Sequence, residues 1–171
     1  RPYAKYSSNG KDKIYVTYTT GHPDNEMPNY VYFNVIDLQA EKDAAGNVTT
    51  NPVLEDVRGN RLSVIADGTF KVDKSQGYRD SYPYTVVDAP GDRRDWVWQV
   101  ASDADGHPVI AMVRISGGKD QHEYFYAKWT GDAWRLTDLA DGGGRFHSSN
   151  TEYCYSGGMA LDPADVKTVY L

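Results

Sequence analysis

The feature that most constrains the fold of this chain is a strand–turn–strand pattern that occurs three times. Each copy has an apolar strand, a polar turn rich in Asp, Asn or Gly, and a second apolar strand. The copies are Tyr3–Tyr18, Trp96–Val113 and Tyr155–Leu171. Asp and Asn accept local backbone hydrogen bonds and Gly adopts positive φ, so these turns suit antiparallel hairpins. The pattern predicts an all-β chain.

Further strand candidates extend the first two hairpins. Tyr30–Ile36 and His122–Trp129 follow them, and Gly131-Asp132 turns the latter into Ala133–Leu139. Four antiparallel strands in succession make up one blade of a β-propeller. Residues 1–171 therefore predict one partial domain of about two blades and the opening hairpin of a third. Because a closed ring needs about four to eight blades, we expect the remaining blades to come from the same chain.

The segment 38–75 departs from the repeat. The interval between the first and second hairpins exceeds the interval between the second and third, which predicts an insertion or a variable hairpin there. Within it, Leu62–Val72 predicts a hairpin with Ala66-Asp67-Gly68 at the turn. Stretch 40–60 predicts a loop or a weak hairpin, because Gly46 and Pro52 interrupt any helical period.

Charge and composition exclude several classes of function. The formal net charge is -6 and the pI is about 5.1, which argues against general nucleic-acid binding because phosphates need a basic face. A locally basic groove remains compatible with an acidic polysaccharide. No stretch of roughly 18 apolar residues is present, so no membrane-spanning helix is expected. The single cysteine, Cys154, excludes an internal disulfide.

A set of motifs distributed along the chain carries a family resemblance. They are RPYAKY at 1–6, GHP at 21–23, WVW at 96–98, DADGHPVI at 103–110, HEYFYAKW at 122–129 and YSGGMALDP at 155–163. Together they resemble the bacterial-neuraminidase-repeat (BNR) proteins, in the branch that contains ulvan-lyase-like polysaccharide lyases and sialidase-like proteins. The resemblance implies a seven-bladed propeller, a secreted or periplasmic location and a substrate groove where the loops between blades converge.

The same resemblance implies a carbohydrate-active enzyme, either a polysaccharide lyase or a glycoside hydrolase. β-Elimination needs a base, an acid and a group that stabilises the charge on the uronate carboxylate. The family's catalytic residues carry over as His22, Tyr78 and Arg94, with a second histidine expected before Arg1. Each also has a structural interpretation: His22 capping a turn beside Pro23, Tyr78 packing, and Arg94 stacking on Trp96.

Four further residues are candidates for substrate binding. His122 and Tyr124 lie on one face of a predicted strand, which either packs in a blade core or faces the groove. Trp96 and Tyr155 are aromatic platforms of the kind that stack on sugar rings. A non-catalytic propeller that binds glycans through such platforms is the alternative function, and a purely structural repeat is the third.

No metal site is predicted. His147, Glu152 and Cys154 lie close together in sequence with His122 nearby, but the spacing HSSNTEYC matches no standard zinc pattern. The Asp-rich turns SDADG and LDPAD lack the twelve-residue spacing of a calcium-binding EF-hand loop. Zinc and calcium are therefore both disfavoured.

Overall fold

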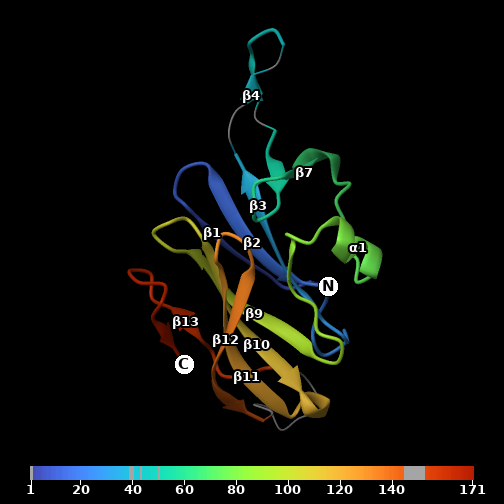
Figure 1. The fold of residues 1–171 in the computed structure, drawn as a ribbon, viewed down its shortest axis with the longest axis vertical. Helices are drawn as coiled ribbons and strands as arrows, with labels where there is room; N and C mark the ends of the chain where they lie inside the picture. The colour runs from blue at the N-terminus through green and yellow to red at the C-terminus, as the bar shows by residue number, and fades with distance from the viewer. Residues whose placement is uncertain (1, 39–40, 43, 50, 145–152) are drawn as a thin grey trace.

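The structure is a computed structural model that describes residues 2–38, 41–42, 44–49, 51–144 and 153–171. Two antiparallel sheets account for most of it, and two small hairpins lie beside them (Figure 1). Within the described residues, no helix is long and apolar enough to cross a membrane. The predicted all-β fold class is confirmed.

The second sheet is a regular four-stranded meander. Its strands are β9 (Arg94–Ser102), β10 (Pro108–Ser116), β11 (Gln121–Trp129) and β12 (Trp134–Gly143), in the spatial order β12-β11-β10-β9. Gly106 and Gly131 adopt φ values of 81° and 95° in the connecting turns, where an L side chain would be strained. The sheet has the four-strand form of a propeller blade, as predicted.

The first sheet begins in the same way. Strands β1 (Ala4–Ser8), β2 (Lys13–Thr19) and β3 (Val31–Asp37) pair antiparallel in succession. Beyond β3, two short strands share the next position: β6 (Val53–Glu55) pairs with the end of β3 and β8 (Val86–Asp88) pairs with its start. The predicted third strand is confirmed, whereas the outer strand of this blade is divided between two segments.

A third hairpin follows the second blade. It consists of β13 (Ala160–Leu161) and β14 (Val169–Tyr170), and the side chain of Asp162 accepts the backbone N–H of Ala164 in its turn. Strand β9 contacts β1 and β2 of the first blade and β13 of the third hairpin. The structure thus contains two blades and the opening hairpin of a third.

The segment 38–75 corrects one prediction. Strands β4 (Glu41–Lys42) and β5 (Val48–Thr49) form a small hairpin that projects from the body of the fold (Figure 1). Strand β7 (Arg61–Val64) pairs with β6 and is followed by a 3₁₀ turn, η1 (Ile65–Asp67). The predicted hairpin Leu62–Val72 is therefore wrong: β7 finds its partner upstream, and residues 69–72 form no strand.

One helix was not predicted. Helix α1 (Gln76–Ser81) is six residues long, and the side chain of Ser75 caps it by accepting the backbone N–H of Tyr78 at 3.2 Å. The helix buries Tyr78 against Tyr32 of β3.

The hydrophobic core has two main parts, one on each face of β10. Ile110 and Met112 pack with Tyr15 and Phe33 between the two blades. On the opposite face, residues such as Val113 pack against the third hairpin. Because successive side chains of a strand point to opposite faces, β10 is buried on both sides, as expected of a strand between packed blades.

Candidate substrate site at the junction of the blades

The loop between β2 and β3 places His22 at the edge of the second blade. Its ring centroid lies 5.4 Å from that of Tyr3 and 5.2 Å from that of Trp96, and its side chain is 23% exposed. The backbone N–H of Asp24 donates to His22 Nδ1 at 3.1 Å. In this geometry the neutral imidazole carries its proton on Nε2, the nitrogen available for a ligand.

Asn29 fixes this loop against β9. Its side chain is fully buried, accepts the backbone N–H of Gly21 at 2.9 Å and donates to the carbonyl oxygens of Gly21 and Asp95. A backbone bridge also pairs Asn29 with Arg94. The position of His22 relative to Arg94 is therefore set by buried hydrogen bonds.

A shallow pocket opens beside His22. It has a volume of about 480 Å³ and is lined by Pro2, Tyr3, Ala4, His22 and Asn25. A second hollow of about 600 Å³ shares Pro2 and Ala4 with it and continues over Tyr6, Tyr18 and Phe70. The two hollows form a groove along β1 with aromatic walls.

Trp96 forms the base of the aromatic cluster behind this pocket. It is 3% exposed, and its ring lies 4.3 Å from Tyr3 and 5.0 Å from Tyr155 between centroids. The Tyr3 and Tyr155 hydroxyl groups are 3.2 Å apart. The structure thus brings Trp96 and Tyr155 together near His22, with Tyr155 the more accessible of the two.

Arg94 begins β9 next to this cluster. Its Nε is buried and has no hydrogen-bond partner, and among the described residues no carboxylate forms an ion pair with its guanidinium. The neighbouring Arg93 differs, because its guanidinium lies 4.0 Å from Asp88 and 3.8 Å from Asp92. Of these two arginines, Arg93 therefore has carboxylates beside it, whereas Arg94 has none among the described residues.

Tyr78 lies in a different environment. It is 7% exposed and its ring packs against Tyr32, Phe70 and Tyr82. Burial, together with these neighbouring phenols, raises the pKa of Tyr78 well above its usual value. None of its described contacts reaches His22 or Arg94, so the structure brings two of the three predicted catalytic residues to one region and places the third in the core.

The segment around Tyr78 is nevertheless tied to the His22 loop. Lys74 forms an ion pair with Glu26 and donates to the carbonyl oxygen of Pro28. Arg79 of α1 donates to the Tyr30 hydroxyl at 2.7 Å. The insertion of the first blade therefore supports the loop that carries His22.

His122 and Tyr124 are buried in the second blade. His122 exposes none of its surface, and its Nε2 lies 3.2 Å from the carbonyl oxygen of Lys119; burial lowers its pKa below the usual value. The Tyr124 hydroxyl donates to the carbonyl oxygen of Gly157 at 2.9 Å. Both side chains contact loop carbonyl groups, and His122 is 0% and Tyr124 8% exposed, so we leave them out of the proposed site.

Comparison with known proteins decides the family. Residues 1–142 match the model of a BNR repeat-containing family. The chain belongs to this family. No curated protein sequence matches the chain significantly.

Two solved structures resemble the fold of this BNR-family chain. One is a PL25 ulvan lyase, of a new polysaccharide lyase family, bound to an oligosaccharide of glucuronic acid and 3-sulfated rhamnose. It is 19% identical with a TM-score of 0.52, and the match covers 79% of this chain and 29% of the lyase. A second ulvan lyase structure is 17% identical with a TM-score of 0.52. That match covers 92% of this chain and 32% of the lyase. This chain thus spans less than a third of either lyase.

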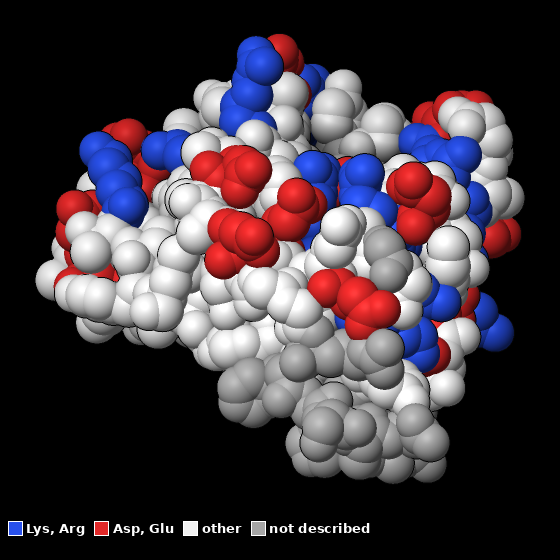
Figure 2. All heavy atoms as spheres, turned by 90° about the horizontal axis from the view of Figure 1, so that it is seen from below, with Lys and Arg blue, Asp and Glu red and all other residues white. Residues whose placement is uncertain are grey.

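The face of this BNR protein that is seen from below has no single sign of charge in its described part. Figure 2 shows acidic and basic side chains interspersed over the described part of the face seen from below. Binding of an anionic polymer here would therefore depend on individual cations rather than on a broad basic patch.

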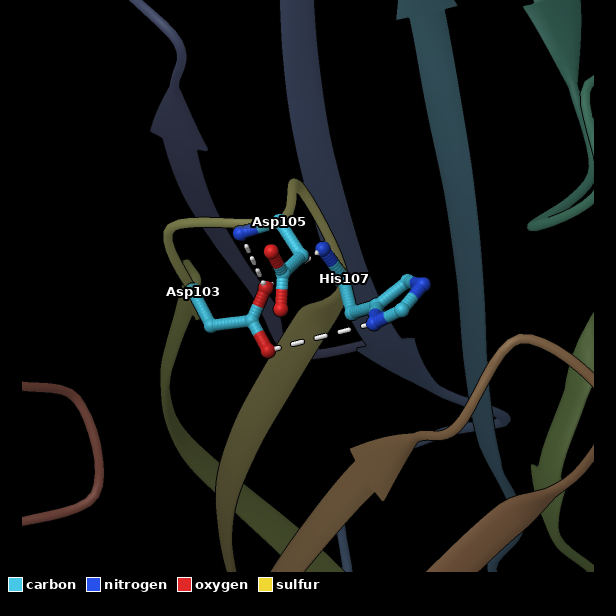
Figure 3. A group of neighbouring side chains, drawn as sticks. All are labelled: Asp103, Asp105 and His107. Atoms are coloured by element: carbon cyan, nitrogen blue, oxygen red, sulfur yellow. Dashed lines mark hydrogen bonds and ion pairs between the residues drawn. The ribbon is translucent and has the colours of Figure 1, made fainter.

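One described group of side chains has metal-ligand chemistry. Asp103, Asp105 and His107 lie together in the β9–β10 turn (Figure 3). Asp103 already accepts the backbone N–H groups of Asp105 and His107, and the Lys128 ammonium lies 2.7 Å from its other oxygen. Burial opposes ionisation of Asp103, but these donors lower its pKa below the usual value. The Asp103 carboxylate is therefore used by the turn itself and by its ion pair with Lys128.

The zinc alternative falls partly outside the described residues, because it includes His147 and Glu152. Its cysteine is described: Cys154 is 1% exposed, and burial together with Asp24 raises its pKa to about 12. A buried, protonated thiol does not favour metal binding.

Asp24 and Lys119 are residues that the sequence did not single out. Lys119 reaches Asp24 across 95 positions, and Asp24 in turn accepts the backbone N–H of Cys154 across 130. No local motif signals contacts between loops so far apart in sequence.

Proposed function

We propose that this chain is part of a carbohydrate-active enzyme that cleaves an acidic polysaccharide by β-elimination, with its uronate subsite at His22 and Arg94. The observation that carries the proposal is the imidazole of His22, which lines the pocket while its Nδ1 accepts the Asp24 backbone N–H. Arg94, whose guanidinium forms no ion pair with a described carboxylate, precedes by two residues the Trp96 ring that contacts His22. The two ulvan lyases of similar fold, one of them bound to a glucuronate-containing oligosaccharide, support this choice of substrate class.

The chemistry assigns distinct tasks to these groups. A base removes the proton on the carbon next to the uronate carboxyl group, and the negative charge spreads onto that carboxylate. The guanidinium of Arg94 and the Nε2–H of His22 donate to the carboxylate oxygens and stabilise this charge. The glycosidic C–O bond then breaks, a C=C bond forms in the ring, and the leaving oxygen takes up a proton.

Tyr78 stays a prediction as the base or acid of this reaction. Its hydroxyl is buried without a hydrogen-bond partner, so it reaches a substrate only if the α1 segment moves outward. The proposal therefore rests on His22 and Arg94.

Hydrolysis is less well supported because it requires two carboxyl groups facing the scissile bond. Asp24, the carboxylate beside His22, is engaged by Lys119 and by the backbone of Cys154. Non-catalytic glycan binding is favoured by one observation, the aromatic groove along β1, and remains the second candidate.

The test is to incubate the full-length protein with polyuronates and sulfated uronate polymers. Ultraviolet absorbance from an unsaturated product indicates elimination, as proposed. New reducing ends without absorbance indicate hydrolysis, and binding without either indicates the lectin-like alternative; both results contradict the lyase proposal. His22→Ala should lower the elimination rate by about 100-fold, the typical effect of removing one donor to a developing negative charge.

A further inference from the structure

Three loops meet at the side chain and backbone of Asp24. Its backbone N–H donates to His22 Nδ1 at 3.1 Å, and its Oδ1 accepts the backbone N–H of Cys154 at 3.1 Å. The ammonium of Lys119 donates to the Asp24 carbonyl oxygen at 2.8 Å and lies 3.5 Å from Oδ1. The Asp24 and Lys119 side chains are only 14% and 20% exposed, so these contacts are partly shielded from water.

Lys119 occupies an unusual backbone conformation. Its φ is 86°, and among the described residues it is the one non-glycine residue with positive φ. Such a conformation is unfavourable for a residue with a Cβ atom and persists where surrounding contacts determine it. Those contacts include Asp24 and the ring of Tyr153, whose centroid lies 5.3 Å from the ammonium. The strain is consistent with a side chain that is held in place by this cluster.

The Asp24 carboxylate can compete with the Asp24 backbone N–H for His22 Nδ1. Asp24 Oδ2 lies 3.8 Å from His22 Nδ1. A carboxylate only accepts hydrogen bonds, so its closer approach would draw the imidazole proton to Nδ1 and leave Nε2 as a lone pair. The backbone N–H of Asp24 imposes the opposite tautomer. Whether the carboxylate or the backbone N–H of Asp24 faces His22 Nδ1 depends on the contacts that fix Asp24, which include Lys119 and the backbone of Cys154.

We propose that Asp24 and Lys119 are positioning residues that keep His22 in the Nε2–H tautomer directed at the pocket. Lys119 holds the carbonyl oxygen and the carboxylate of Asp24 away from the imidazole, so that the backbone N–H alone faces Nδ1. This inference deepens the proposed function and rests on it, since the Nε2–H group is the donor assigned to the uronate carboxylate.

The direct test is nitrogen-15 NMR of the imidazole nitrogens in the full-length protein, which distinguishes the two tautomers without any substrate. Wild-type protein should show His22 with its proton on Nε2 at pH values where the ring is neutral. Lys119→Met should move the population toward the Nδ1–H form, and Lys119→Arg should retain the wild-type tautomer because it keeps the charge. A wild-type spectrum with the proton on Nδ1 would overturn the proposal even if the variants do not fold.

A matched control separates this role from the loss of any ion pair. Lys128 also pairs with an aspartate, at 2.7 Å, but at the β9–β10 turn. Lys128→Met should leave the His22 tautomer unchanged. If Lys119→Met and Lys128→Met give the same His22 spectrum, Lys119 has no positioning role.

Cys154 supplies a second readout, because it is the single cysteine of the chain and its backbone is held by Asp24. Alkylation of the native protein should be several-fold faster in Lys119→Met than in wild type and unchanged in Lys128→Met. Equal rates in all three proteins would contradict the proposed coupling of these loops.

The outcomes also separate this inference from the proposed function. If no acidic polysaccharide is cleaved but the tautomer follows Lys119, the function fails and the positioning role stands. If elimination depends on His22 but neither the tautomer nor kcat responds to Lys119→Met, the positioning role fails alone. With both correct, Lys119→Met lowers kcat by about tenfold with a smaller change in KM, because a misdirected donor weakens the transition state most.

Discussion

The two blades begin with the same hairpin and third strand but end differently. In the second blade, β9 to β12 form an uninterrupted meander of strands nine or ten residues long. In the first blade, the outer position is divided between β6 and β8, each three residues long, and the chain between them builds β7, η1 and α1. The regular blade provides the packing, and the irregular blade supports the loop that carries His22.

Burial follows the same division. Strand β10 lies between two packed layers and its apolar side chains are almost completely buried. Strand β1 has one open face, where Tyr6 is 64% exposed and the groove lies. A surface left open beside a rigid sheet is a typical place for a ligand. The comparison predicts that substitutions in the second blade affect stability and that those around β1 affect binding.

The largest effect on stability is expected in β10. Ile110→Ala should lower the free energy of unfolding by about 3 kcal/mol, because Ile110 is fully buried between the blades and its truncation leaves a cavity. Ile65→Ala, at a side chain that is 40% exposed in the first blade's insertion, should cost much less. Urea denaturation monitored by tryptophan fluorescence measures both, and equal losses would contradict the contrast between the blades.

The second largest loss of stability is expected at Asn29, whose buried side chain joins the His22 loop to β9. Asn29→Ala should cost about 2 kcal/mol, because it leaves the Gly21 N–H and the Gly21 and Asp95 carbonyl oxygens without this partner. Asn51→Ala, at an exposed residue, is the matched control and should stay within about 0.5 kcal/mol of wild type. The same denaturation assay applies, and a neutral Asn29→Ala would show that the His22 loop is held by other contacts.

A buried carboxyl group at the start of β9 should make stability depend on pH. Asp95 exposes none of its surface; burial and then the neighbouring Asp88 carboxylate raise its pKa well above 3.8, against the opposing effects of Arg114 and Arg93. The unfolded chain therefore loses its proton at lower pH than the folded protein. The contribution of Asp95 to the free energy of unfolding therefore falls as pH rises above about 4. It levels off above the pKa of Asp95 in the folded protein.

Asp95→Asn removes this penalty. It should stabilise the protein at neutral pH by roughly 1.4 kcal/mol for each unit of the pKa shift and have little effect below about pH 3.8. Thermal unfolding across this pH range measures the difference, with the exposed Asp105→Asn as control. A stabilisation that does not change with pH would contradict the assignment.

The smallest change in stability is expected at Tyr78. Its hydroxyl is buried without a hydrogen-bond partner, so Tyr78→Phe should raise the free energy of unfolding by less than about 1 kcal/mol. The elimination rate decides its role. An unchanged rate places Tyr78 in the core alone, whereas a large loss of rate without a loss of stability shows that α1 opens during the reaction.

The hairpins and the third strands were predictable because their signals are local. Turn chemistry around Gly106 and Gly131 and the alternation of apolar residues define them within short windows. The division of the outer strand between β6 and β8 was not predictable, because three-residue strands have too few side chains to show a period. Helix α1 is likewise too short for a helical period, and its position depends on packing against Tyr32.

The candidate site was predictable in part. His22 and Trp96 were identified, and the structure places their rings 5.2 Å apart. Tyr78 was carried over from the family resemblance, and His122 and Tyr124 were chosen because they share one face of a predicted strand. Neither signal shows whether a side chain faces a groove or a core. The Asp24–Lys119 contact was missed because it joins two loops that only the packing of the blades brings together.

The most direct test of the central claim compares two adjacent arginines. Arg94 has no described carboxylate partner, whereas Arg93 lies near Asp88 and Asp92. Formation of unsaturated product from an acidic polysaccharide should fall by about 100-fold in Arg94→Ala and stay near the wild-type rate in Arg93→Ala. Equal rates in wild type and Arg94→Ala, with both variants folded, would contradict a uronate subsite at the junction of the blades.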